Sequence, residues 1–293
     1  MKVAVAKYPI QAPADFAAFA ERQAAMLGVA AAQGARVAVL PEYLSLELAA
    51  TFDASTQADL HASLAAIQRH RDDWLALYAR LAASLDMYVV AGTFLLAQAD
   101  GRYRNRCDVF APQGAHLWQD KLQLTGFEKG LGVIEGGDAL KVFDLDGVHT
   151  GVAVCYDSEF PLPVRAQAEA GARLLLVPSC TDTDAGATRV RVGCLARALE
   201  NRLFVAQSVT AGEAPWSPAL DINTGEAAIF APMDRGLPAD GVVTQTTGDQ
   251  VWVIAELDLD ALDRSRADAQ VANDRDWMVQ LKPDLARAKL QAW

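Results

Sequence analysis

The sequence predicts an α/β protein whose mixed sheet is covered by helices. Short, nearly continuous runs of Val, Ala and Leu alternate with longer amphipathic stretches, as in sheets buried by helices. The dipeptide Asp146-Gly147 lies between two apolar runs and signals an antiparallel hairpin. No linker rich in Pro, Gly or Ser divides the chain, so we expect one domain over residues 1–260 and a C-terminal arm over 261–293.

Each strand is predicted from an apolar run of about five residues, such as KVAVAK, RVAVL or YVVAGTF. The expected strands are residues 2–7, 36–40, 88–94, 107–111, 116–121, 140–144, 148–154, 173–177, 203–208, 219–222, 226–230, 241–246 and 251–256. The amphipathic stretches predict helices at 14–33, at 55–85 as one helix or two, from about 162, and at 188–201. A glycine-rich loop is expected after residue 121.

Composition and charge exclude several classes of partner. The chain carries 26 basic and 37 acidic residues, a formal net charge of −11, without a basic cluster. Nucleic acid and anionic membrane are therefore not expected partners. No run reaches the roughly 18 apolar residues of a membrane span, and the N-terminus lacks a secretory pattern, so we expect a cytoplasmic protein.

Cysteine and histidine spacing predicts free thiols and neither a metal nor a cofactor. Cys107, Cys155, Cys180 and Cys194 include no CxxC pair and are too few for a disulfide framework in 293 residues. The four histidines form no HxH or HExxH pattern. Reduced thiols fit the expected cytoplasmic location.

Three expected strands end in residues that could form a chemical unit. Glu42 follows RVAVL, Lys121 follows HLWQD, and Cys155 follows GVAV. Sites collect at the carboxyl ends of strands in α/β sheets, where a carboxylate could take a thiol proton and an ammonium could stabilise an oxyanion. The positive charge is also expected to lower the thiol pKa. By spacing alone, a solvated carboxylate, an exposed lysine and a core cysteine remain open alternatives.

Three motifs together resemble a known superfamily. PEY at 41–43, DKLQLTGFEKG at 120–130 and GVAVCYDSEFP at 151–161 resemble, in order, the three catalytic signatures of the nitrilase, or carbon–nitrogen hydrolase, superfamily. AGARLLLVPSCT and RVRVGCLARALENRLFVAQSV are also similar to family segments, and the resemblance runs to about Leu259. It implies a four-layer αββα sandwich.

The resemblance also implies roles for named residues. Cys155 would be the nucleophile, Glu42 the general base, and Lys121 the oxyanion stabiliser, with Glu128 orienting the lysine or the substrate and the backbone N–H of Tyr156 as second oxyanion donor. The implied function is hydrolysis of non-peptide carbon–nitrogen bonds, in first place as an amidase acting on a small amide through a thioester. A nitrilase, an N-carbamoyl hydrolase and a catalytically silent binding module on the same fold are the alternatives.

Position in the sequence also suggests two alternative catalytic residues and several residues of the pocket. Glu135 is the rival to Glu128, and Cys180 is the rival nucleophile because it too follows an apolar strand. Tyr43, Thr181, Asp182 and Trp216 are expected in the pocket wall, although Trp216 could instead anchor a loop.

Glu159 stands where several amidase branches of the family carry an arginine that meets a substrate carboxylate. A glutamate there argues against an acidic substrate and favours a neutral or cationic one. Alternatively, it caps the helix that begins near Pro161, where a carboxylate suits the helix dipole.

The C-terminal arm is expected to pack on the domain or on a second copy of the chain. It is charged but carries Trp277, Met278, Leu281 and Trp293. The family commonly pairs through helices such as the one ending in Ala198-Leu-Glu-Asn201, so the resemblance implies a homodimer.

Overall fold

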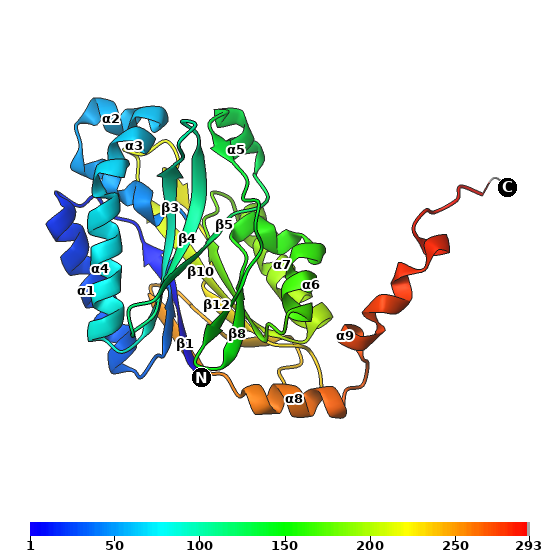
Figure 1. The fold of residues 1–293 in the computed structure, drawn as a ribbon. Helices are drawn as coiled ribbons and strands as arrows, with labels where there is room; N and C mark the ends of the chain where they lie inside the picture. The colour runs from blue at the N-terminus through cyan, green and yellow to red at the C-terminus, as the bar shows by residue number, and fades with distance from the viewer. Residues whose placement is uncertain (292–293) are drawn as a thin grey trace.

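The computed structural model describes residues 1–291 and confirms the four-layer αββα arrangement. Two halves of a sheet lie face to face, α1 and α4 cover one outer face, and α6 and α7 cover the other (Figure 1). The strands are β1 (Lys2–Pro9), β2 (Val37–Val39), β3 (Tyr88–Ala97), β4 (Tyr103–Phe110), β5 (His116–Asp120), β6 (Ile134–Glu135), β7 (Val142–Leu145), β8 (Val148–Val152), β9 (Leu174–Ser179), β10 (Phe204–Glu213), β11 (Ile222–Asn223), β12 (Ala228–Phe230), β13 (Val242–Gln245) and β14 (Trp252–Glu256). The α-helices are α1 (Phe16–Ala32), α2 (Ala54–Ala58), α3 (Leu60–Ile67), α4 (Arg71–Ser84), α5 (Gly126–Leu131), α6 (Pro161–Glu169), α7 (Asp184–Asn201), α8 (Leu259–Ala267) and α9 (Asn273–Asp276).

Strand β1 joins the two halves of the sheet. The sheet runs in the order β5-β4-β3-β2-β1-β10-β9-β8-β7. The first part of β1 pairs parallel with β2 and antiparallel with β14, while its last residues, Lys7–Pro9, pair parallel with β10. The predicted hairpin at Asp146-Gly147 is confirmed by the antiparallel pairing of β7 with β8. The sheet is therefore mixed, as expected.

The period of two along β1 divides its side chains between two cores. Val3 and Val5 belong to a core that also contains residues of the other half of the sheet, such as Leu175. Ala4 and Tyr8 belong to a second core beneath α1 and α4. Because both faces of the strand are covered, its central residues Val3–Ala6 are all apolar and do not alternate with polar ones.

Helix boundaries follow from capping side chains. Asp15 accepts a hydrogen bond from the N–H of Ala18, so α1 begins at Phe16. Asp53 and Asp59 cap α2 and α3 in the same way, which breaks the stretch predicted as one or two helices into three α-helices. A polar side chain that bonds to the backbone three residues on starts a new helix wherever it falls in an amphipathic run.

Two local expectations were wrong. Residues 219–221 do not form a strand, and only Ile222 of the expected strand belongs to one, the two-residue β11, because Asn223 donates to the carbonyl oxygens of Leu220 and Gly212 and closes a turn there. The glycine-rich loop contains the short helix α5, which starts with a capping box between Thr125 and Glu128. In both places a side chain–backbone bond decides the local structure.

The C-terminal segment is divided in two. Helix α8 packs on the domain, with Leu262 fully buried and Arg202 donating to the carbonyl oxygen of Ser265. Beyond α9 the chain extends away from the sandwich (red in Figure 1), with Met278 and Leu281 exposed. Trp293 lies outside the described residues. Within residues 1–291, no helix is long and apolar enough to cross a membrane.

A bulge in β3 sets the position of the loop that follows β2. Gly92 has a φ of 67°, and a Cβ there would lie 2.1 Å from the carbonyl oxygen of Pro41. The next residue, Thr93, donates its N–H to this same oxygen and accepts the N–H of Tyr43. The glycine thus allows the close backbone approach that holds the PEY motif.

We predict that Gly92→Ala lowers the free energy of unfolding by about 2–4 kcal/mol, because the methyl group meets backbone as well as an unfavourable φ. Gly236→Ala is the matched control, since Gly236 has a φ of 75° but open space around it. It should cost only about 1 kcal/mol. Urea unfolding of both variants measures the difference, and equal losses would show that the contact with Pro41 is unimportant.

Candidate active site

A cavity of about 380 Å³ opens at the carboxyl ends of the central strands. It is lined by Glu42, Lys121 and Cys155 together with residues of α7 and of the segment before β11. Loops that follow different strands converge at this edge, which explains how residues more than 100 positions apart in the chain meet here.

Glu42 is held from several sides at the end of β2. Its side chain is 1% exposed. Its Oε1 atom accepts the Nδ2 of Asn105 at 2.8 Å, and its Oε2 atom accepts the backbone N–H of Cys180 at 3.1 Å. The following residue, Tyr43, has a φ of 61°, and its N–H is bound by Thr93. The carboxylate is therefore fixed before any substrate arrives.

Lys121 lies between two carboxylates. Its Nζ is 2.8 Å from Glu42 Oε1 and 2.8 Å from Glu128 Oε2, and all three side chains are buried. Glu128 occupies the first turn of α5, where it also accepts the N–H of Thr125. The backbone of Lys121 donates to Asn105 and accepts from Gly137. The structure thus brings Glu128 and Glu42 to the same ammonium, as the resemblance implies.

Cys155 begins a 3₁₀ turn, Cys155–Glu159, directly after the loop that follows β8. Its φ of 47° is in the left-handed region, which costs about 1–3 kcal/mol for a non-glycine residue and marks functional sites. The Sγ atom lies 3.6 Å from the carbonyl oxygen of Cys180, in the cavity that Glu42 and Lys121 also line. The hydroxyl of Ser158 donates to the Cys155 carbonyl at 2.7 Å and supports the turn.

The buried cluster carries one ammonium against two carboxylates. Burial raises the pKa of Glu42, and the charge of Lys121 offsets this only in part. Burial opposes the charge on Lys121, but the two carboxylates outweigh it and hold the lysine pKa well above its ordinary value. For Glu128, burial is outweighed by Lys121 and by hydrogen bonds, so its pKa is lowered. Glu128 and Lys121 are therefore the fixed ion pair, and Glu42 is the carboxylate most ready to accept a proton.

The expectation of a lowered thiol pKa at Cys155 was wrong. Burial raises the pKa of Cys155 well above its ordinary value, the charge of Glu42 raises it further, and Lys121 compensates only in part. A thiolate would add a second net negative charge to a buried cluster that already has one. The raised pKa therefore favours the neutral thiol in the resting site.

Asn105 on β4 is a member of the site that the sequence did not reveal. Its Nδ2 donates to Glu42 at 2.8 Å and to Glu128 Oε1 at 3.2 Å, so one amide group joins both carboxylates. The expected strand began at residue 107, which left Asn105 in a loop. A strand that starts at Tyr103 places Asn105 inward, on the same face as Cys107. Extending the period of two from Cys107 back to Asn105 is the signal that could have found it.

The expected pocket residues fall into two groups. Tyr43, Thr181, Tyr156 and Glu159 line the cavity. Burial, together with the nearby charges of Glu128 and Glu42, raises the pKa of Tyr43 well above its ordinary value.

Trp216 does not line the cavity and packs instead against the core beneath α1 and α4, as the loop-anchor alternative holds. Pro218, Ala219 and Ile222 line the cavity in its place, because the turn closed by Asn223 presents them there.

Glu159 does not cap α6. The N-cap residue of α6 is Phe160, without a side-chain capping bond, and Pro161 at the first position removes a donor that a cap would satisfy. The Glu159 carboxylate lies 3.7 Å from Arg189 Nε at the cavity wall. The structure therefore contradicts the helix-capping interpretation of Glu159 and agrees with its placement at the cavity.

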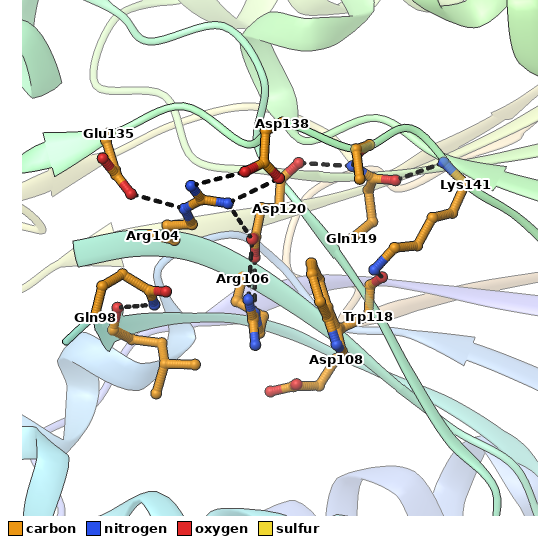
Figure 2. A network of polar contacts seen from close by, with 12 residues as sticks. Gln98, Arg104, Arg106, Asp108, Trp118, Gln119, Asp120, Glu135, Asp138 and Lys141 are labelled. Atoms are coloured by element: carbon orange, nitrogen blue, oxygen red, sulfur yellow. Dashed lines mark hydrogen bonds and ion pairs between the residues drawn. The ribbon is translucent and has the colours of Figure 1, made fainter. Parts of the chain in front are cut away.

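Glu135 and Cys180, the alternatives to Glu128 and Cys155, differ in whether they line the cavity. Glu135 binds Arg104 Nε at 2.9 Å, in a network of ion pairs on β4 that does not line the cavity (Figure 2). Cys180 does line the cavity, but its Sγ is 3.2 Å from Asn223 Oδ1 and burial raises its pKa. Cys107 and Cys194 are fully buried core thiols. Among residues 1–291, no group of three or more His, Cys, Asp or Glu side chains could hold a metal ion.

Comparison with known proteins agrees with this geometry. A model of the carbon–nitrogen hydrolase family matches residues 2–266. The chain is 29% identical to the probable hydrolase YhcX of Bacillus subtilis over 94% of its own length, and it spans 53% of that protein. It is 24% identical to the omega-amidase NIT2-A of Xenopus laevis, covering 87% of this chain and 88% of that relative.

Among solved structures, a carbon–nitrogen hydrolase from Helicobacter pylori G27 superimposes with a TM-score of 0.76 at 18% identity, covering 98% of both chains. That likeness shows the shared fold, and the family match extends over nearly the whole chain. The protein therefore belongs to the carbon–nitrogen hydrolase family and has the fold of the nitrilase superfamily.

Proposed function

We propose that this protein is an amidase that releases ammonia or an amine from a small amide through a thioester on Cys155. The observation that carries the proposal is the buried ammonium of Lys121, held 2.8 Å from both Glu42 and Glu128 beside a thiol in a cavity. A fixed positive charge next to a nucleophile stabilises the oxyanion that forms when an acyl carbon is attacked. The omega-amidase name of one relative supports the choice of an amide.

The first half of the reaction forms the thioester. The sulfur of Cys155 attacks the amide carbon while its proton passes to Glu42. The carbonyl oxygen becomes an oxyanion, which Lys121 and the backbone N–H of Tyr156 bind. The carbon–nitrogen bond then breaks, Glu42 gives its proton to the leaving nitrogen, and ammonia or an amine departs. The raised pKa of Glu42 suits a group that must both accept and return a proton near neutral pH.

The second half releases the acid. Water gives a proton to Glu42 and attacks the thioester carbon, and the same two donors bind the new oxyanion. Collapse expels the Cys155 sulfur, which regains a proton from Glu42, and the carboxylic acid leaves. Glu128 remains ionised throughout and keeps Lys121 in place. This division into two steps requires only the residues of the cavity.

The walls of the cavity favour a neutral or cationic amide. Glu159, Asp182 and Asp221 line it, while Arg189 is the lining cation outside the catalytic cluster within the described residues. Arg189 is paired with Glu159 at 3.7 Å, so the remaining carboxylates leave a negative field around the opening. An ammonium or guanidinium group on the substrate would be attracted to it, and a carboxylate would be repelled.

A screen for ammonia release over primary amides, carbamoyl compounds and nitriles tests the reaction class. We expect amides to be the best substrates, with Cys155→Ala as the blank. Glu42→Gln keeps the shape of the side chain but cannot carry the proton, and it should lower kcat/KM by about 10³-fold or more. Turnover confined to nitriles or carbamoyl compounds would select those alternatives, and no turnover by the folded wild type would favour the silent module.

Neutralising one charged residue of the cavity wall at a time tests the substrate class. Glu159→Gln should lower kcat/KM for an amide with a side-chain ammonium by about tenfold relative to its neutral isostere, the effect of about 1.4 kcal/mol. Arg189→Gln should act in the opposite direction and raise kcat/KM for the cationic amide. Steady-state kinetics of the two variants on the matched amides measures both effects, and changes of the same sign would contradict the assignment.

We also propose that the chain forms a homodimer. The segment beyond α9 exposes Met278, Val279 and Leu281, which a second copy could cover. Light scattering at micromolar concentration is expected to give about twice the mass of the chain. A monomer under these conditions would refute the dimer.

A further inference from the structure

We propose that Asp157 is a positioning residue whose buried carboxylate joins the segment of Lys121 to the segment of Cys155 and thereby sets the spacing of lysine and sulfur. This inference deepens the proposed function and rests on it for its kinetic consequences. Asp157 lies in the turn that begins at Cys155, but it does not line the cavity and does not touch the reacting atoms.

The carboxylate of Asp157 accepts hydrogen bonds from two separate parts of the chain. From the lysine segment it accepts the N–H of Leu122 at 3.1 Å and the N–H of Gln123 at 2.7 Å. From the nucleophile segment it accepts the N–H of Val154 at 3.2 Å. These three donors are the two residues after Lys121 and the one residue before Cys155. One side chain therefore fixes both catalytic segments to each other.

The three N–H groups that Asp157 accepts belong to loops. Strand β5 ends at Asp120 and β8 ends at Val152, so Leu122, Gln123 and Val154 lie beyond the regular ladders. Asp157 is 2% exposed, and unpaired N–H groups at such a depth would be costly. The carboxylate satisfies them while leaving the sheet free to end where the cavity opens.

The position of the Lys121 ammonium depends on its backbone, because the lysine side chain is long and flexible. The N–H of Lys121 is bound to Asn105 and its carbonyl oxygen accepts from Gly137, which fixes one side of the residue. The bonds from Leu122 and Gln123 to Asp157 fix the chain that leaves it. Without them, the ammonium could keep its carboxylate partners but shift relative to the sulfur. Displacements of about 1 Å in a reacting pair can cost about 10²-fold in rate.

The negative charge of Asp157 is stabilised by hydrogen bonds from backbone N–H groups. Burial raises the pKa of Asp157 to about 6, and the N–H donors and Lys121 limit the rise. No salt bridge to Asp157 is formed among residues 1–291. At neutral pH the group is a carboxylate with acceptor oxygens only, which matches its donors. An asparagine of the same shape would turn an NH₂ group toward one set of N–H donors.

The test compares Asp157→Asn with Asp120→Asn. Asp120 is a matched control because it is also a buried carboxylate beside Lys121, but it pairs with Arg106 at 2.8 Å and not with the nucleophile turn (Figure 2). Both variants lose a buried carboxylate and should lower the thermal midpoint. We expect Asp157→Asn to lower kcat by about 100-fold with KM within about threefold, and Asp120→Asn to keep kcat within about fivefold.

A second readout needs no substrate. The rate at which iodoacetamide alkylates Cys155, followed by peptide mass spectrometry, should be at least about fivefold lower in Asp157→Asn than in Asp120→Asn, because a displaced Lys121 stabilises the thiolate less. If the wild type hydrolyses no amide, the proposed function fails, yet the alkylation rates still decide the role of Asp157.

The remaining outcomes are also decisive. Equal kcat and equal alkylation rates in the two folded variants would overturn the proposal and leave Asp157 a purely structural acceptor. If Asp157→Asn does not fold, Asp157→Ser replaces it, since serine keeps a small acceptor without an opposing NH₂ group. If neither folds while Asp120→Asn does, the carboxylate is a folding element and the proposal is likewise overturned.

Discussion

The site depends on one buried ammonium that faces two carboxylates. Removing such charges from water is costly unless each has a partner at close range, and Lys121 has Glu42 and Glu128 at 2.8 Å. Because the negative charges are in excess, a proton is easily accepted by Glu42, and the thiol of Cys155 is kept neutral until it reacts. In the proposed reaction, this charge balance gives a fixed ion pair that stabilises the oxyanion and a second carboxylate that moves the proton.

Holding that cluster together requires support from the backbone. Tyr43, which follows Glu42, and Cys155 itself both have φ values in the left-handed region. Each is stabilised by a neighbouring hydroxyl, since Thr93 accepts the N–H of Tyr43 and Ser158 donates to the carbonyl of Cys155. Strained positions persist only where the surroundings determine them, and here the bulge at Gly92 and the turn after β8 do so.

Much of the molecule could be predicted from the order of its residues. Buried strands with both faces covered appear as apolar runs, and the turn at Asp146-Gly147 has a local cause, so most elements were placed within a few residues. The motifs around Glu42, Lys121 and Cys155 were identifiable because each occupies a short, continuous stretch. The failures were also local in origin: the turn closed by Asn223 and the capping box of α5 rest on single side chain–backbone bonds that override the apolar pattern.

The linear pattern therefore determined the fold class and which side chains meet in the candidate site, since periodicity predicts the first and contiguous motifs mark the second. The three-dimensional arrangement alone decided how these residues behave. Asn105 lies far from Glu42 and Glu128 in the sequence, yet it binds both carboxylates. Trp216 packs away from the cavity, whereas Glu159 faces it. The thiol pKa is raised rather than lowered because burial and the sum of nearby charges depend on distances in space, which spacing along a chain does not contain.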